Sequence, residues 1–384
     1  MKFPGEIEAK LPHVGTTIFT IMSKLATEHN AINLSQGFPD FDCSEELIRL
    51  VNQYMLKGFN QYAPLAGVIP LLEGISEKME KLYGASYDPV KEITVTAGAT
   101  QAIYTAITSV IMKEDEVIIF DPAYDCYAPT VELCGGVPVN ISLSYPDYKI
   151  DWDIVKARIN DKTRMIVINT PSNPAGVVIG EEDMRKLEEI LNNTKIILLS
   201  DEVYEHIIFD GKQHQSVAKY TKLAERAFVI YSFGKTFHAT GWKIGYCLAP
   251  ENLMKEFRAV HQFNVFTVNT AIQYALADYI KNEDNYNFLP SFYQKKRDMF
   301  TQVISASRFS FVASEGTYFQ LVDYSKISEE KDTDFAKWLT TEKGVGSIPV
   351  SVFHASGQDD KVVRFSFCKK VETIEQAGEL ICRI

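Results

Sequence analysis

Short apolar runs alternate with amphipathic stretches between about residues 90 and 250. The runs are rich in Val and Ile, as strands usually are, whereas the stretches 101–112 and 181–192 repeat their apolar residues with helical spacing. A wholly apolar run such as 196–199 suits a strand that is covered on both faces. The pattern therefore predicts a mostly parallel sheet between layers of helices. The predicted strands are Glu92–Thr96, Val117–Phe120, Val137–Ile141, Met165–Asn169, Ile196–Ser200 and Ala227–Tyr231.

The pattern changes after about residue 285. A basic helix at 293–301 leads to two alternating strands at 318–322 and 362–367, which helical stretches separate. We expect a smaller α+β domain here. The predicted division is residues 1–44 as an N-terminal segment that joins the small domain, 45–285 as the large domain and 286–384 as the small domain. Repeats and Gly/Ser linkers are missing from the sequence, so we expect the domains to pack closely.

Composition limits the kind of partner. The chain has 384 residues, of which 46% are hydrophobic and 23% charged, as in ordinary globular proteins. No apolar stretch approaches the roughly 18 residues of a membrane span, and the first residues lack the apolar core of a secretion signal. We therefore expect a cytoplasmic protein without membrane contact. The net charge of −11 argues against nucleic acid as a partner.

Common metal and nucleotide motifs are missing. The six cysteines form no C-x-x-C pair, and the seven histidines form no H-E-x-x-H motif, so we expect neither a disulfide framework nor a metal site. The sequence also lacks the glycine patterns of dinucleotide and P-loop sites. A bound phosphate would need a small local site.

Polar and aromatic residues follow five of the predicted strands. In open α/β sheets, ligands bind beyond the carboxyl ends of the strands, so these residues should meet at one site. The first group lies at a predicted helix start, where free N–H groups and the helix dipole favour a phosphate. In chain order the residues are Gly98, Ala99 and Thr100, then Tyr124, Asn173, Asp201 with Tyr204, and Ser232 with Lys235.

This set matches the needs of pyridoxal phosphate. Lys235 supplies the amine for a Schiff base, and Asp201 pairs with the pyridine nitrogen. The carboxylate raises the pKa of that nitrogen, so the ring stays protonated and can accept electrons. Asn173 and Tyr204 can donate hydrogen bonds to the ring hydroxylate. We therefore predict Lys235, Asp201 and Tyr204 as the catalytic residues.

Nine sequence blocks resemble the fold-type-I aminotransferases of the kynurenine and glutamine-phenylpyruvate branch, and most of all bacterial methionine aminotransferases. They span nearly the whole chain and occur in the order expected. The resemblance implies a mostly parallel seven-stranded sheet, a smaller α+β domain, and amino-group transfer from an amino acid to a 2-oxo acid. The blocks are IFTIMS (18–23), LSQGFPDF (34–41), NQYAPLAG (60–67), TAGATQA (96–102), DPAYDCY (121–127), NTPSNPAG (169–176), SDEVY (200–204), SFGKTFHATGWKIGY (232–246) and VRFSF (363–367).

The resemblance also implies roles for single residues. Ala99, Thr100, Ser232 and Lys243 would contact the phosphate, and Tyr124 would stack on the ring. The family commonly has arginine at the place of Lys243, and a lysine lacks the bidentate fork that fixes a phosphate. Arg364 would bind the substrate α-carboxylate, with help from Gly37 and Asn173. Tyr62 would reach the phosphate of a neighbouring subunit, which implies a homodimer with shared sites.

The side-chain pocket is expected to be apolar. Aspartate-specific relatives carry a second arginine for the substrate side chain, and neither NQYAPLAG nor IFTIMS contains one. If they converge as the resemblance implies, aromatic residues form a wall that suits a thioether or a flat ring. We therefore predict methionine and aromatic amino acids as donors. The wall would consist of Phe19, Phe38, Tyr62, Phe266 and Phe353.

Other functions fit the sequence less well. Ser232-x-x-Lys235 matches the motif of penicillin-recognising enzymes, but their Ser-Asp-Asn and Lys-Thr-Gly partners are missing. A non-catalytic regulator would need an added basic helix-turn-helix segment. The alternative that stays open is a C–S β-lyase acting on cysteine conjugates, because it uses the same cofactor and the same first proton abstraction.

Overall fold

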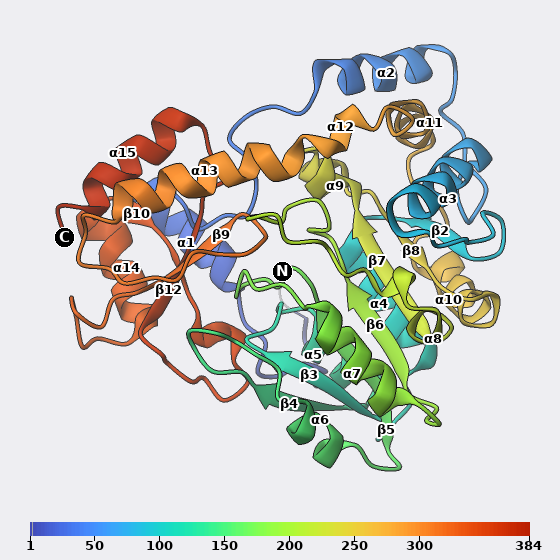
Figure 1. Cartoon of the computed structure of the whole chain (residues 1–384), viewed down its shortest axis with the longest axis horizontal. Coiled ribbons are helices and arrows are strands. Elements are labelled where there is room, and N and C mark those ends of the chain that lie inside the picture. The colour runs from blue at the N-terminus through green and yellow to red at the C-terminus, as the bar shows by residue number, and fades with distance from the viewer. Residues whose placement is uncertain (2) are drawn as a thin grey trace.

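A seven-stranded sheet forms the centre of the computed structural model, which describes Met1 and residues 3–384 (Figure 1). The strand order is β2-β8-β7-β6-β5-β3-β4; β8 runs antiparallel to both neighbours, and the other pairs are parallel. The α/β fold with a mostly parallel sheet is thus confirmed. The strands are β2 (Ile93–Thr96), β3 (Glu116–Asp121), β4 (Val137–Ser142), β5 (Thr163–Asn169), β6 (Ile197–Asp201), β7 (Ala227–Ser232) and β8 (Gly245–Leu248).

Helices cover both faces of this sheet because its strands are apolar on both sides. On β6, Ile197 and Leu199 pack against one helix layer and Leu198 against the other. The first layer contains α4 (Ala99–Val110), α5 (Tyr127–Leu133) and α10 (Glu251–Asn264). The second contains α3 (Ile69–Tyr83), α6 (Trp152–Arg158), α7 (Glu181–Leu191) and α8 (Thr221–Ala224).

A smaller three-stranded antiparallel sheet lies beside the large one (Figure 1). Its central strand is β12 (Val362–Ser366), between β9 (Phe319–Asp323) and β11 (Ile348–Pro349). The alternating pattern places Val363 and Phe365 on one face of β12 and Arg364 on the other, and all five residues of this strand are buried. Phe365 packs on Phe300 of α13, whereas Arg364 lines a pocket beside the large sheet.

The remaining elements connect and cover these two sheets. In Figure 1 the long helix α13 runs from the side of the large sheet to that of the small one. One continuous hydrophobic core includes Leu198 of the large sheet and Val363 of the small sheet. These elements are α1 (Ile18–Glu28), β1 (Ile32–Asn33), α2 (Glu45–Leu56), α9 (Phe233–Thr236), α11 (Thr270–Tyr279), α12 (Asp284–Asn287), α13 (Leu289–Ile304), α14 (Asp332–Lys343), β10 (Val345–Gly346) and α15 (Val371–Ile381).

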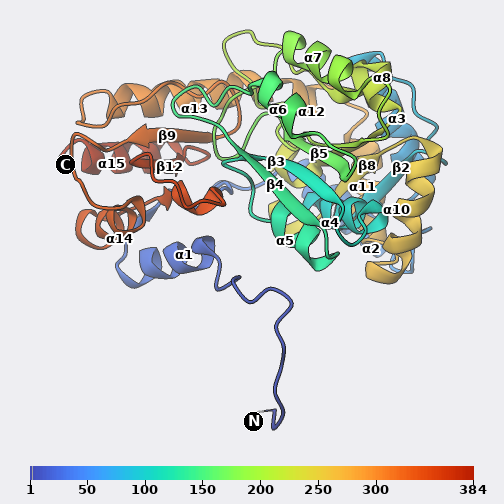
Figure 2. The ribbon, with the colours of Figure 1, turned by 90° about the horizontal axis from the view of Figure 1, so that it is seen from below.

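The segment before α1 extends away from the rest of the chain (Figure 2). Its contacts with the body are few; His13 meets Glu132 of α5 with 3.0 Å between Nε2 and Oε2. Over the part of the chain that is described, no helix is long and apolar enough to cross a membrane.

Candidate active site

The carboxyl ends of the parallel strands open into a pocket of about 220 Å³. β6 ends there at Asp201 and β7 at Ser232, while the first residues of α4 border it from the side. The small sheet contributes the opposite wall through β9 and β12. The residues named from the sequence that line this pocket are Phe19, Gly37, Gly98, Ala99, Thr100, Tyr124, Asn173, Asp201, Tyr204, Ser232, Lys235, Lys243 and Arg364.

Lys235 lies on the short helix α9, directly after β7. Its Nζ donates to the hydroxyl oxygen of Tyr318 at 2.9 Å and to the carbonyl oxygen of Gly37 at 3.3 Å. Burial lowers the pKa of Lys235 to about 8, and the positive charges of Lys243 and Arg364 act in the same direction. A large part of this amine is therefore uncharged in mildly alkaline solution, as a nucleophile or proton acceptor requires.

Asp201 is 3% exposed at the end of β6. One carboxylate oxygen accepts from the Tyr127 hydroxyl at 2.6 Å, and the other accepts from the Val203 backbone N–H at 3.3 Å. No nitrogen of Lys, Arg or His among the described residues lies within 4.0 Å of the carboxylate. Burial raises the pKa of Asp201 to about 6. A buried acid without a cation beside it suits a positively charged ligand group.

The start of α4 offers unpaired backbone donors. Gly98 precedes the helix with a φ of 79°, and no side chain of the described residues caps the helix end. The Nζ of Lys243 lies 3.4 Å from the place that a Cβ on Gly98 would occupy. Gly245 brings β8 close, because a Cβ there would sit 2.5 Å from the Tyr231 carbonyl oxygen and 3.2 Å from the Ala99 nitrogen. Backbone donors, a lysine and the helix dipole together favour a phosphate.

Arg364 projects from β12 into the same pocket and is 1% exposed. One guanidinium nitrogen donates to the Asn173 side-chain oxygen at 2.6 Å and another to the Ser35 carbonyl oxygen at 3.2 Å. Its buried Nε has no partner among the described residues. Burial lowers the pKa of Arg364 to about 10, so the group stays charged at neutral pH. A buried cation with an unused donor suits a carboxylate.

Aromatic rings surround this arginine. The Phe319 ring centre lies 3.8 Å from its central carbon, and those of Phe19 and Phe353 lie 5.4 and 5.5 Å away. Phe19 and Phe353, both named from the sequence, are 5.9 Å apart. They bring apolar surface next to the carboxylate position.

Three of the expected aromatic residues lie elsewhere in the single chain. Tyr62 and Phe266 contact each other with ring centres 5.4 Å apart, and they are 83% and 44% exposed. Phe38 is 47% exposed and lies under the Lys369 ammonium. None of the three lines the pocket within one chain. The role expected for Tyr62 concerns a neighbouring subunit and stays a prediction.

Sequence reasoning missed four residues that contact or support the site. The Tyr318 hydroxyl donates to the Gly37 carbonyl oxygen at 2.5 Å and accepts a hydrogen bond from Lys235 Nζ. Asn169 donates to the Asp201 carbonyl oxygen at 2.9 Å and accepts from the Asn173 N–H at 2.7 Å. Phe319 and Tyr127 have the contacts described above. Only Tyr127 and Asn169 lie within the sequence blocks that resemble the aminotransferases, so only these two could have been found from the sequence.

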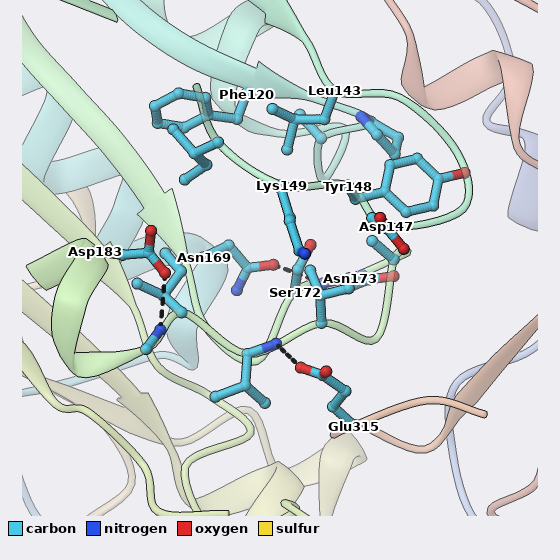
Figure 3. A pocket seen from close by; sticks show the side chains of 18 of the residues that line it. Phe120, Leu143, Asp147, Tyr148, Lys149, Asn169, Ser172, Asn173, Asp183 and Glu315 are labelled. Atoms are coloured by element: carbon cyan, nitrogen blue, oxygen red, sulfur yellow. Dashed lines mark hydrogen bonds between the residues drawn. The ribbon is translucent and has the colours of Figure 1, made fainter. Parts of the chain in front are cut away.

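A second cavity of about 460 Å³ adjoins the catalytic pocket (Figure 3). The two share Tyr124, Asn169 and Asn173 as lining residues. Figure 3 shows the Asn169–Asn173 bond at this boundary and Lys149 directed into the cavity. Tyr127 also lines the cavity. The two cavities therefore meet at Tyr124, Asn169 and Asn173.

These features fit pyridoxal phosphate. The start of α4 can hold its phosphate, Tyr124 can face its ring and Asp201 can face its ring nitrogen. Lys235 lines the same pocket, where its amine can form the Schiff base with the cofactor. Each demand of the group meets a residue of opposite charge or matching hydrogen-bonding type.

Comparison with known proteins places the chain in a class. Residues 29–381 match the model of the family described as aminotransferase class I and II, and the chain belongs to this family. Aminotransferases of this class depend on pyridoxal phosphate and move an amino group between an amino acid and a 2-oxo acid.

Particular relatives cover almost the whole chain. It is 48% identical to a methionine aminotransferase of Escherichia coli, covering 97% of each chain. It is 33% identical to kynurenine–oxoglutarate transaminase 1 of Mus musculus, covering 94% of this chain and 93% of the mouse protein. The crystal structure of YbdL from Escherichia coli, identified as a methionine aminotransferase, superimposes with a TM-score of 0.96 at 46% identity and covers 99% of this chain and 100% of YbdL.

Proposed function

We propose that this aminotransferase uses Lys235 to link pyridoxal phosphate and takes methionine and aromatic amino acids as donors. The observation that carries the proposal is the meeting of Lys235, Asp201, Arg364 and the α4 start in one pocket. When bound, the cofactor supplies a carbonyl carbon for the amine and a ring that accepts electrons.

The protein side chains divide the remaining work. Arg364 binds the α-carboxylate and orients the substrate, since it lines the pocket as a buried cation whose Nε has no partner among the described residues. Lys235 can take a proton from the substrate α-carbon and return it, because its lowered pKa leaves part of the amine uncharged. Asp201 holds the proton on the ring nitrogen. Asn173 and Tyr204 line the pocket where a ring hydroxylate would need donors.

The preference for methionine and aromatic donors rests on the rings near Arg364. Phe19, Phe319 and Phe353 offer apolar and polarisable contacts to a thioether or ring. No arginine other than Arg364 lines the pocket among the described residues, so a substrate side-chain carboxylate would be buried without a partner. The Escherichia coli relatives are named as methionine aminotransferases, which supports methionine as a donor.

The assembly proposed is a cytoplasmic homodimer with shared active sites. Tyr62 and Phe266 form an exposed aromatic pair outside the chain's own pocket. Large exposed rings of this kind are typical of contact surfaces. Tyr62 would then complete the phosphate site of the second subunit.

A steady-state screen tests the donor class. Methionine and phenylalanine should exceed aspartate in kcat/KM by roughly 100-fold or more, because the pocket offers no partner for a second carboxylate. Double-reciprocal plots against the 2-oxo acid should be parallel, as in a ping-pong reaction. A wide preference for aspartate would contradict the pocket. Pyruvate release from cysteine conjugates that exceeds transamination would favour the β-lyase instead.

A further inference from the structure

We propose that Tyr127 is a positioning residue for the reaction: its hydroxyl holds the Asp201 carboxylate ionised and aimed at the cofactor ring nitrogen. The inference rests on the proposed pairing of Asp201 with that nitrogen. Tyr127 would act through Asp201 without touching cofactor or substrate.

The geometry makes this hydroxyl the main anchor of the acid. Tyr127 is the first residue of α5, is 2% exposed and donates to Asp201 across 2.6 Å. It is the only side chain among the described residues that donates to this carboxylate, since the second bond comes from the Val203 backbone. The Tyr127 ring packs edge-on to Tyr124, with centroids 5.8 Å apart. The two rings thus brace both the face and the nitrogen side of the cofactor position.

Charge explains why the bond matters. Burial raises the pKa of Asp201, whereas the Tyr127 hydrogen bond and the charge of Lys235 lower it and the charge of Glu202 raises it. Burial and the nearby Asp201 raise the pKa of Tyr127 well above its usual value, so the phenol stays a donor at every working pH. Without that donor the acid would hold its own proton more tightly. A neutral acid cannot stabilise a protonated ring nitrogen.

The alternative is that Tyr127 only fills space in the core. The chain offers a matched tyrosine for comparison. Tyr148 is also 2% exposed and lines the same adjoining cavity, but its buried hydroxyl has no partner among the described residues. Replacing each tyrosine by phenylalanine removes one buried oxygen and keeps the ring. Only Tyr127→Phe removes a bond to Asp201.

The test uses holoenzyme loaded with ¹⁵N-labelled pyridoxal phosphate and follows the ring-nitrogen resonance by NMR as pH changes. In Tyr127→Phe the ratio of the nitrogen-protonated form to the Asp201-protonated form should fall by roughly tenfold or more, which moves the resonance at neutral pH towards that of an unprotonated ring, since a hydrogen bond to a charged group has about this strength. The kcat for methionine should fall by roughly 10- to 100-fold. KM should change little, because Arg364 is untouched.

Three further variants make the outcome decisive. Tyr148→Phe should leave the resonance and kcat unchanged. Incorporation of 3-fluorotyrosine at position 127 keeps the hydroxyl and strengthens its donation to the carboxylate, so the resonance should stay at the protonated position. A move towards the unprotonated position would overturn the proposal, and this arm decides if Tyr127→Phe does not fold. An unchanged resonance in Tyr127→Phe overturns the proposal even if kcat falls. Asp201→Asn tests the pairing of Asp201 with the ring nitrogen separately from the role of Tyr127. If this variant also leaves the resonance unchanged, the pairing is wrong.

Discussion

Asp201 and Lys235 are buried in the same pocket, and burial shifts their pKa values in opposite directions. The pKa of Asp201 rises to about 6 and that of Lys235 falls to about 8. Both groups therefore change charge within the range in which enzymes work. Environments that shift the pKa values of acids and bases towards 7 are typical of sites for proton transfer.

The raised pKa of Asp201 predicts that the ionised carboxylate, which catalysis needs, destabilises the cofactor-free protein. Because the folded-state pKa lies above the unfolded value of 3.8, this group contributes stability at low pH that is lost as pH rises through about 6. Asp201→Asn removes the charge. The free energy of unfolding of its apoprotein, compared with that of the wild type, should therefore be larger at pH 7.5 than at pH 5 by about 1–2 kcal/mol. Urea unfolding at both pH values measures this gain.

The same substitution should lower kcat of the holoenzyme by roughly 100-fold or more, because an amide cannot hold the ring nitrogen protonated. Apoprotein stability that falls equally with pH in both proteins would contradict the stated pKa.

The guanidinium group of Arg364 should be essential for substrate binding. Arg364→Lys keeps a positive charge but loses the fork that binds a carboxylate through two nitrogens. We expect kcat/KM for methionine to fall by roughly 30- to 1000-fold, mainly through KM, as for truncation of a buried charged pair. The cofactor absorption spectrum should be unchanged. A large change in the spectrum with an unchanged KM would place Arg364 at the cofactor instead.

Single residues at strand ends could be predicted from the sequence, whereas their neighbours from distant segments could not. Lys235 and Asp201 follow apolar strands, and that position alone marks them. Tyr318 meets Gly37 across 281 positions of sequence, and Phe319 meets Arg364 from the neighbouring strand. Such contacts depend on how two sheets meet, which a local pattern does not contain.

Among the secondary-structure elements, β8 carries the close approach that shapes the phosphate site. Gly245 at its start leaves no room for a side chain, since a Cβ would lie 2.5 Å from a backbone oxygen of β7. The hydrophobic pattern does not predict β8, because its four residues, GYCL, begin with glycine and contain one strongly apolar residue. Strands in the middle of the sheet were predictable because both of their faces are apolar.

Gly245→Ala should therefore weaken cofactor binding. The added methyl group must push β8 away from the Ala99 nitrogen at the start of α4, and backbone atoms on both sides cannot yield cheaply. We expect the dissociation constant of pyridoxal phosphate to rise roughly tenfold or more, measured by fluorescence titration. Gly241→Ala is the control, because a Cβ at that position meets nothing within 4 Å. Equal affinities in the two variants would show that the close approach does not shape the site.

The whole molecule presents its exposed aromatic pair away from its own catalytic pocket. We propose that a second subunit covers Tyr62 and Phe266, which are 83% and 44% exposed. The division into segments 1–44, 45–285 and 286–384 also remains a prediction, because one hydrophobic core includes residues of both sheets.

Sedimentation analysis tests the shared site. The active species should be a dimer, and Tyr62→Phe should weaken cofactor binding by roughly tenfold through loss of one hydrogen bond to a phosphate. Mixing Tyr62→Phe with Lys235→Ala subunits gives a sharper test, because a mixed dimer would combine both defects in one site and leave the other intact. A fully active monomer would contradict the shared site.

Chemical labelling can identify the lysine that links the cofactor. Borohydride reduction of the holoenzyme fixes pyridoxal phosphate on the lysine that holds it, and peptide mapping then identifies that residue. We predict a single labelled peptide that carries the cofactor on Lys235, and no label in Lys235→Ala. A label on Lys243 or on any other lysine would show that Lys235 is not the linking residue.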